Sequence, residues 1–116
     1  MERDGRMILE RSLFGKTITC RAEKLDQGVH VLLTGGDQSH IGAYTLAEPG
    51  RAPATTAFPG HKDQFLSEPW AKALSEKTGA RTLVVCGIHY DNATKEQIGA
   101  IVDACSELLA ELLEKV

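Results

Sequence analysis

The sequence has few aromatic residues, no long apolar segment and no marked excess of one charge, and these shortages exclude several classes of protein. Its 16 acidic and 13 basic side chains give a net charge of −3. No cluster of Lys and Arg lies along any expected helix or strand, so nucleic-acid binding is not expected. No apolar run exceeds about five residues, too few to span a bilayer. The first residues also lack the apolar core of a signal peptide, so we expect a cytoplasmic protein with no membrane partner.

Cysteine is scarce as well, with three residues at Cys20, Cys86 and Cys105 and no CxxC spacing. A disulfide framework or a zinc knuckle would need paired or closer cysteines. Each of the three has an apolar context, which suits a small buried thiol. We therefore predict that all three are structural.

The first half of the chain has the pattern of strands joined by short turns. Ile18, Cys20 and Ala22 alternate with polar residues, and this period of two indicates one buried and one solvated face. Gly15-Lys16 is a suitable two-residue turn. Four strands in an antiparallel meander are therefore expected, over 7–14, 17–25, 29–33 and 41–47.

The second half mixes helices with one further strand. Residues 48–60 hold three of the four prolines and predict a loop. A helix is expected from near Ser67 to a stop at Gly79. The apolar run at 81–88 is typical of a strand buried on both faces, and 94–115 has the spacing of a long amphipathic helix.

These elements predict an α+β fold in a single domain over residues 1–116. The order is β-β-β-β-α-β-α, and the long helix begins with a capping box formed by Thr94 and Gln97. The economical arrangement is a mainly antiparallel sheet of about five strands with two helices on one face. A doubly wound nucleotide-binding fold is disfavoured because strand and helix alternate only once.

Three segments, 34–43, 60–63 and 87–94, are rich in Gly, His and Asp and lie at the ends of the expected elements or between them. Such positions are where a scaffold presents groups to a ligand. Backbone amides of a Gly-Gly turn can hold an anion, and lysine and histidine add side-chain donors. We therefore predict a site for a phosphate- or carboxylate-bearing ligand in which three histidines converge. The predicted binding residues are Gly35, Gly36, Asp37, Ser39, His40, His61, Lys62, His89 and Asn92.

Taken one at a time, each of these features has an ordinary explanation, such as turn glycines or surface histidines. Two chemical alternatives also stay open. The three histidines with Asp37, Asp63 or Asp91 could bind zinc, although no HxH or HxxxH pair is present. A small enzyme could use His40, His61 and His89 as acids and bases on an anionic substrate, or a nucleophile at Ser39 or Cys86.

The segments TGGDQSHIGA, GHKD and GIHYDNATKEQI, in this order, resemble the small LpdD-like family over about residues 28–105. Its members are D-type partner proteins of gallate-decarboxylase-like enzymes, described as prenylated-flavin chaperones. The resemblance implies a fold like that of proteasome-assembly chaperones. It also implies a non-catalytic helper that binds prenylated FMN and assists maturation of a prenylated-FMN-dependent decarboxylase. It leaves a homo-oligomer open and identifies no particular decarboxylase.

Overall fold

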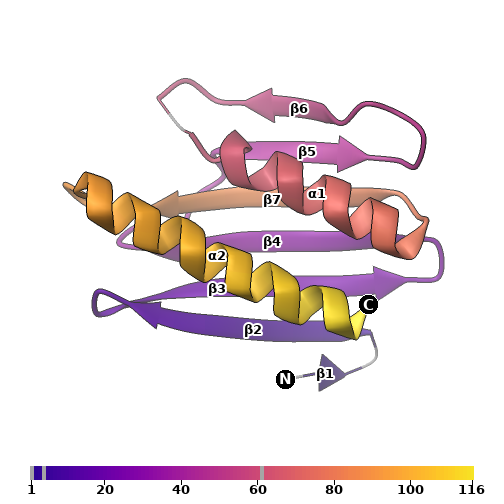
Figure 1. The fold of residues 1–116 in the computed structure, drawn as a ribbon, viewed down its shortest axis with the longest axis horizontal. Coiled ribbons are helices and arrows are strands. Elements are labelled where there is room, and N and C mark those ends of the chain that lie inside the picture. Colours follow the sequence, from indigo (N-terminus) through magenta and orange to yellow (C-terminus); the bar gives the residue numbers. More distant parts are fainter. Residues whose placement is uncertain (1, 4, 61) are drawn as a thin grey trace.

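The computed structural model describes residues 2–3, 5–60 and 62–116. In chain order the elements of the described residues are β1 (Glu2–Arg3), β2 (Arg6–Leu13), β3 (Lys16–Leu25), β4 (Gly28–Gly36), β5 (Ala43–Ala47), β6 (Ala54–Ala57), α1 (Gln64–Thr78), β7 (Thr82–His89) and α2 (Lys95–Lys115). The strands form one sheet in the order β1-β2-β3-β4-β7-β5-β6 (Figure 1). The predicted α+β class is confirmed.

The sheet differs from the prediction in strand count and in one pairing. The described residues form seven strands where about five were expected, because β1 and the short β6 also pair with the sheet. The expected four-strand meander is wrong at its last step. β7 lies between β4 and β5 and runs parallel to β4. In this position β7 has a paired strand on each side. A continuous apolar composition favours such a central, buried position in a sheet.

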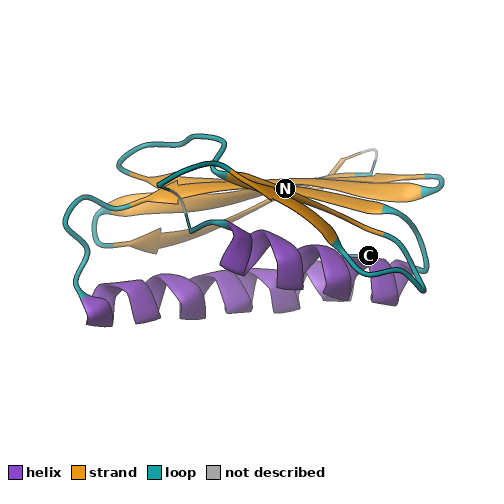
Figure 2. Cartoon of the chain, turned by 90° about the horizontal axis from the view of Figure 1, so that it is seen from above, coloured by secondary structure: helices purple, strands orange, loops and turns teal. Residues whose placement is uncertain are grey.

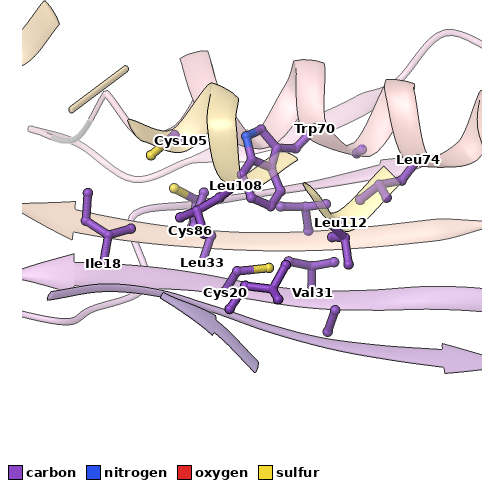
Figure 3. Close-up of a cluster of buried hydrophobic side chains, with 14 of the residues drawn as sticks. Ile18, Cys20, Val31, Leu33, Trp70, Leu74, Cys86, Cys105, Leu108 and Leu112 are labelled. Carbon is purple, nitrogen blue, oxygen red and sulfur yellow. The ribbon is translucent and has the colours of Figure 1, made fainter. Parts of the chain in front are cut away.

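Both helices cover the same face of the sheet, as predicted (Figure 2). Trp70 and Leu74 of α1, with Leu108 and Leu112 of α2, are buried against side chains from the middle of the sheet (Figure 3). These apolar side chains recur at helical spacing, so one stripe of each helix is removed from water. This burial fixes the helices above the central strands.

The helix boundaries show one difference from the sequence. α1 begins at Gln64, three residues before Ser67, and Pro69 lies in its second turn. Proline at that position removes one amide donor of the helix ladder, which α1 tolerates because its buried stripe holds it on the sheet. At α2 the prediction is confirmed, since Thr94 and Gln97 form the reciprocal capping box. In the part of the chain that the structure describes, no helix is long and apolar enough to cross a membrane.

Candidate functional site

A cavity of about 440 Å³ opens where the carboxyl end of β7 meets the first turns of α1 and α2. Strand β7 ends, and α2 begins, toward the left of Figure 1. Strand β7 contributes Ile88 and continues into Tyr90, which also borders the cavity. The two helices contribute most of the remaining walls. The lining side chains are mainly apolar, and they include Phe65, Leu66, Ile88, Tyr90, Ile98, Ile101 and Val102.

The mouth of this cavity exposes large apolar side chains. Phe65 is 69% exposed, Ile98 51% and Val102 45%, although all three border the same opening. Lys62 also borders it, is exposed, and forms no ion pair with any described residue. An apolar hollow with one cation at its edge suits a ligand that has a flat apolar body and an anionic group.

A buried carboxylate connects the walls of the cavity. Asp63 precedes α1, and its Oδ1 accepts hydrogen bonds from the Ile88 amide at 2.9 Å and the Cys86 thiol at 3.7 Å. Its Oδ2 lies 3.2 Å from Nε2 of His40. His40 is the predicted site residue that the fold brings to this carboxylate, and it belongs to the loop that follows β4.

Gly35 and Gly36, whose backbone amides were predicted to hold an anion, are required by the packing and the backbone conformation at the end of β4. A Cβ at Gly35 would lie 2.5 Å from the Thr17 carbonyl oxygen, and Gly36 has a φ of +82°. The amide of Asp37 donates to the His89 carbonyl oxygen at 2.6 Å, so this amide is not available to a ligand. Ligand binding by these residues stays a prediction.

The side chain of Asp37 fastens the exit of β7. Its Oδ2 accepts a hydrogen bond from the Asp91 amide at 2.8 Å, and its Oδ1 lies 3.7 Å from the Lys16 ammonium. His89 contacts the Asp91 carboxylate at 2.9 Å. Asn92 has a φ of +53° in the turn before α2, a conformation that asparagine tolerates well. Asp37 therefore joins the end of β4 to the exit of β7, whereas His89 is the last residue of β7 and Asn92 belongs to the turn that follows it.

Of the nine predicted residues, Lys62 and His89 border the cavity, and His40 contacts a lining residue. Ser39 is exposed in the loop after β4. His61 lies outside the described residues, so the convergence of three histidines stays a prediction.

Sequence reasoning missed the role of three residues that shape this region. Gly42 and Gly87 were not singled out, and Asp63 was considered only as a possible zinc ligand. A Cβ at Gly42 would lie 1.9 Å from Asp63 Oδ2, and one at Gly87 would lie 1.6 Å from the His40 carbonyl oxygen. A glycine inside an otherwise apolar strand often marks such a close backbone approach. That signal was present at Gly87. Asp63 carried none, because a single Asp before a helix is usually only a cap.

The cysteines are free and buried, as predicted. Burial raises the pKa of Cys20 and of Cys105 to about 12, and it raises that of Cys86 further, with the Asp63 charge adding to the effect. The thiols are therefore protonated at neutral pH and are poor nucleophiles. Within residues 2–3, 5–60 and 62–116, no three His, Cys, Asp or Glu side chains are grouped so as to hold a metal ion.

Comparison with known proteins identifies the family. The prenylated flavin chaperone LpdD-like domain model matches residues 13–116. The chain belongs to this family. Protein LpdD of Lactiplantibacillus plantarum is 32% identical over 88 residues, which cover 72% of this chain and 65% of that protein. The match therefore spans slightly less than two thirds of that relative.

The fold has a solved counterpart. A chain in the crystal structure of a chaperone complex for yeast 20S proteasome assembly superposes with a TM-score of 0.54 at 14% identity, covering 94% of this chain and 98% of that one. At this identity the likeness concerns the fold alone. It confirms the expected proteasome-assembly-chaperone-like architecture for this family member.

Proposed function

We propose that this chain, acting as one domain, binds prenylated FMN in the cavity between α1, α2 and the end of β7 and passes it to an apo-decarboxylase. The observation that carries the proposal is the cavity itself, which occurs in a member of a prenylated-flavin chaperone family. Its volume of about 440 Å³ lies in the usual range for small-ligand sites, roughly 300–1,000 Å³. Its apolar walls suit the prenyl-modified ring system better than a polar metabolite.

The polar groups suit the other end of such a ligand. Lys62 at the mouth supplies a positive charge for a phosphate, and His89 supplies a second polar group. Tyr90 donates its hydroxyl hydrogen bond to the Leu13 carbonyl oxygen at 3.0 Å and has its ring edge-on to Phe14. Its ring is therefore held in place and offers a fixed wall to a flavin.

The other tyrosine of the chain, Tyr44, does not border this cavity. Tyr44 is exposed on β5 between buried neighbours, so it lies on the sheet face away from the helices. It therefore cannot stack on the same ligand as Tyr90. Transient holding suits this limited aromatic surface better than storage, because aromatic contacts contribute much of the energy of ring binding.

The exposed mouth also suits transfer to a partner. Phe65, Ile98 and Val102 leave apolar area in water that a decarboxylase surface could cover during handover. A ligand held in a mouth open on the helix side can leave without unfolding of the sheet.

The alternative of an acid–base enzyme receives less support from the geometry. Both ring nitrogens of His40 already face oxygen acceptors, the Gln38 carbonyl and the Asp63 carboxylate. His89 contacts Asp91. A general acid or base must reach the substrate proton, and the His40 ring faces groups of the protein instead.

Titration of the protein with FMN, riboflavin and prenylated FMN tests the proposal. We expect FMN to bind more tightly than riboflavin, and Lys62→Met to weaken FMN binding by about 1 kcal/mol, as for an exposed charge pair. Binding should also weaken with salt, since exposed charges are screened within about 8 Å at physiological ionic strength.

Two matched substitutions on α2 locate the site. Val102→Asp places a charge at the cavity mouth and should raise the Kd for FMN at least about tenfold, because a carboxylate is costly to desolvate beside an apolar ligand. Ala110→Asp adds the same charge on an exposed turn of the same helix, away from the cavity, and should leave the Kd unchanged. If wild type binds neither FMN nor prenylated FMN, the proposed function is wrong.

A further inference from the structure

Asp63 occupies the position before a helix but does not act as a cap. Its backbone is helical, with φ −65° and ψ −17°, and its side chain makes no hydrogen bond to the first turn of α1. An aspartate at that position ordinarily accepts from the second or third helical amide. Here the side chain turns inward, is only 6% exposed, and meets donors that belong to other segments.

The three donors come from different walls of the region. The Ile88 amide and the Cys86 thiol belong to β7, and the His40 ring belongs to the loop between β4 and β5. Because Ile88 lines the cavity and Asp63 begins the helix that carries Phe65, this carboxylate fixes one wall relative to another. A buried carboxylate is stable only when such donors are in place.

The loop between β4 and β5 is in close contact with this carboxylate. Gly42 approaches Asp63 Oδ2 so closely that a methyl group would overlap it, and its amide donates to the Cys86 carbonyl oxygen at 2.9 Å. His40 faces an acceptor on each side, with Nδ1 3.1 Å from the Gln38 carbonyl oxygen and Nε2 3.2 Å from the carboxylate. A ring nitrogen that carries a proton donates to the oxygen that it faces, so this ring can link the loop backbone to the carboxylate.

We propose that Asp63 is the positioning residue of the cavity and that His40 is the partner that keeps it in place. The carboxylate holds the end of β7 and the start of α1 at the separation that the flavin requires. The inference rests on the proposed function for its ligand, but the arrangement of the walls exists without ligand and can be measured separately.

The test uses the full chain with Asp63→Asn, His40→Gln and the double variant. Asparagine keeps the shape and an oxygen for the Ile88 amide but loses the charge that pairs with His40. Glutamine keeps a donor for Asp63 but not the ring that also faces the Gln38 carbonyl oxygen. The control is Glu48→Gln, which removes the 2.7 Å ion pair with Arg81 at the opposite end of β7. FMN is the probe for Kd, and amide hydrogen exchange of residues 38–42 and of Ile88 is measured without ligand.

We expect each single variant to raise the Kd for FMN about tenfold or more, the effect of losing a hydrogen bond to a charged group. The Kd of the double variant should exceed that of the weaker-binding single variant by no more than about twofold, because both changes remove the same contact. Exchange should accelerate at Ile88 and in the loop. The control should leave the Kd and this exchange unchanged.

Unchanged Kd values in folded Asp63→Asn and His40→Gln would overturn the positioning role while leaving the proposed function intact. Additive losses in the double variant would overturn it as well, because the two residues would then act separately. If wild type binds no flavin, the proposed function fails, and exchange alone decides this inference. Faster exchange in both variants supports Asp63 as the residue that positions these walls, and unchanged exchange overturns it.

Discussion

Gly87→Ala should be among the most damaging small substitutions in this protein. Gly87 lies in the middle of the sheet, opposite Thr34 of the parallel strand β4. An added Cβ would lie 1.6 Å from the His40 carbonyl oxygen and 2.3 Å from its carbon. The neighbour is backbone, so no side-chain rotation relieves the overlap, and the strand is held on both sides.

The loop must therefore withdraw by about 2 Å to restore ordinary van der Waals contact. That movement breaks the 3.2 Å contact of His40 with Asp63 and the 2.9 Å bond from the Gly42 amide to the Cys86 carbonyl. A hydrogen bond to a charged group contributes about 1.5–3 kcal/mol and a neutral one about 0.5–1.5 kcal/mol. Alanine stabilises the folded state by only about 0.4–1 kcal/mol, because it lowers the conformational entropy of the unfolded chain. We expect a net loss of about 1–4 kcal/mol.

Urea denaturation followed by Trp70 fluorescence measures this loss, since Trp70 is the single tryptophan and is buried in the core. With a slope of about 2 kcal/mol/M, the midpoint should fall by about 0.5–2 M. The matched control is Gly99→Ala on α2, where an added Cβ meets nothing within 4 Å. It should stabilise the protein by about 0.5–1 kcal/mol, as expected for glycine in a helix. If Gly87→Ala unfolds at the wild-type midpoint, the close approach deduced for this strand is wrong.

Three further outcomes are expected. Leu108→Ala should cost about 2–5 kcal/mol of unfolding free energy, because Leu108 is fully buried, whereas Leu25→Ala at the exposed end of β3 should cost less than about 0.5 kcal/mol in the same urea assay. A thiol reagent at neutral pH should label none of the cysteines until the protein unfolds, and rapid labelling of the native protein would contradict their burial. The contribution of the buried thiols to stability should be complete below about pH 8.5. Above that pH the unfolded thiols lose their protons, whereas burial raises the pKa of the native ones to about 12 or beyond and they stay protonated. The free energy of unfolding should therefore fall by up to about 1.4 kcal/mol per pH unit for each thiol. Urea midpoints at pH 7.5 and 9.5 measure this slope, which should be shallower in Cys105→Ala.

Local pattern sufficed for most elements of this fold. Alternation at Ile18, Cys20 and Ala22 determined a one-sided strand, and the stripe with the Thr94 capping box determined α2. The family could be identified from three short segments, because the spacing of Gly, His and Asp within a motif is a property of the sequence. These features depend on neighbours in the chain, which are visible without a structure.

Tertiary packing decided what the sequence left open. The insertion of β7 between β4 and β5 depends on which strand gains most from two neighbours, and that comparison involves the whole sheet. The cavity arises from elements distant in sequence, so its apolar wall at Phe65, Ile98 and Val102 could not be recognised beforehand. The use of Asp63 was also hidden, because a carboxylate before a helix caps it unless stronger donors lie nearby. Only the folded chain brings His40 and the Ile88 amide within hydrogen-bonding distance of that carboxylate.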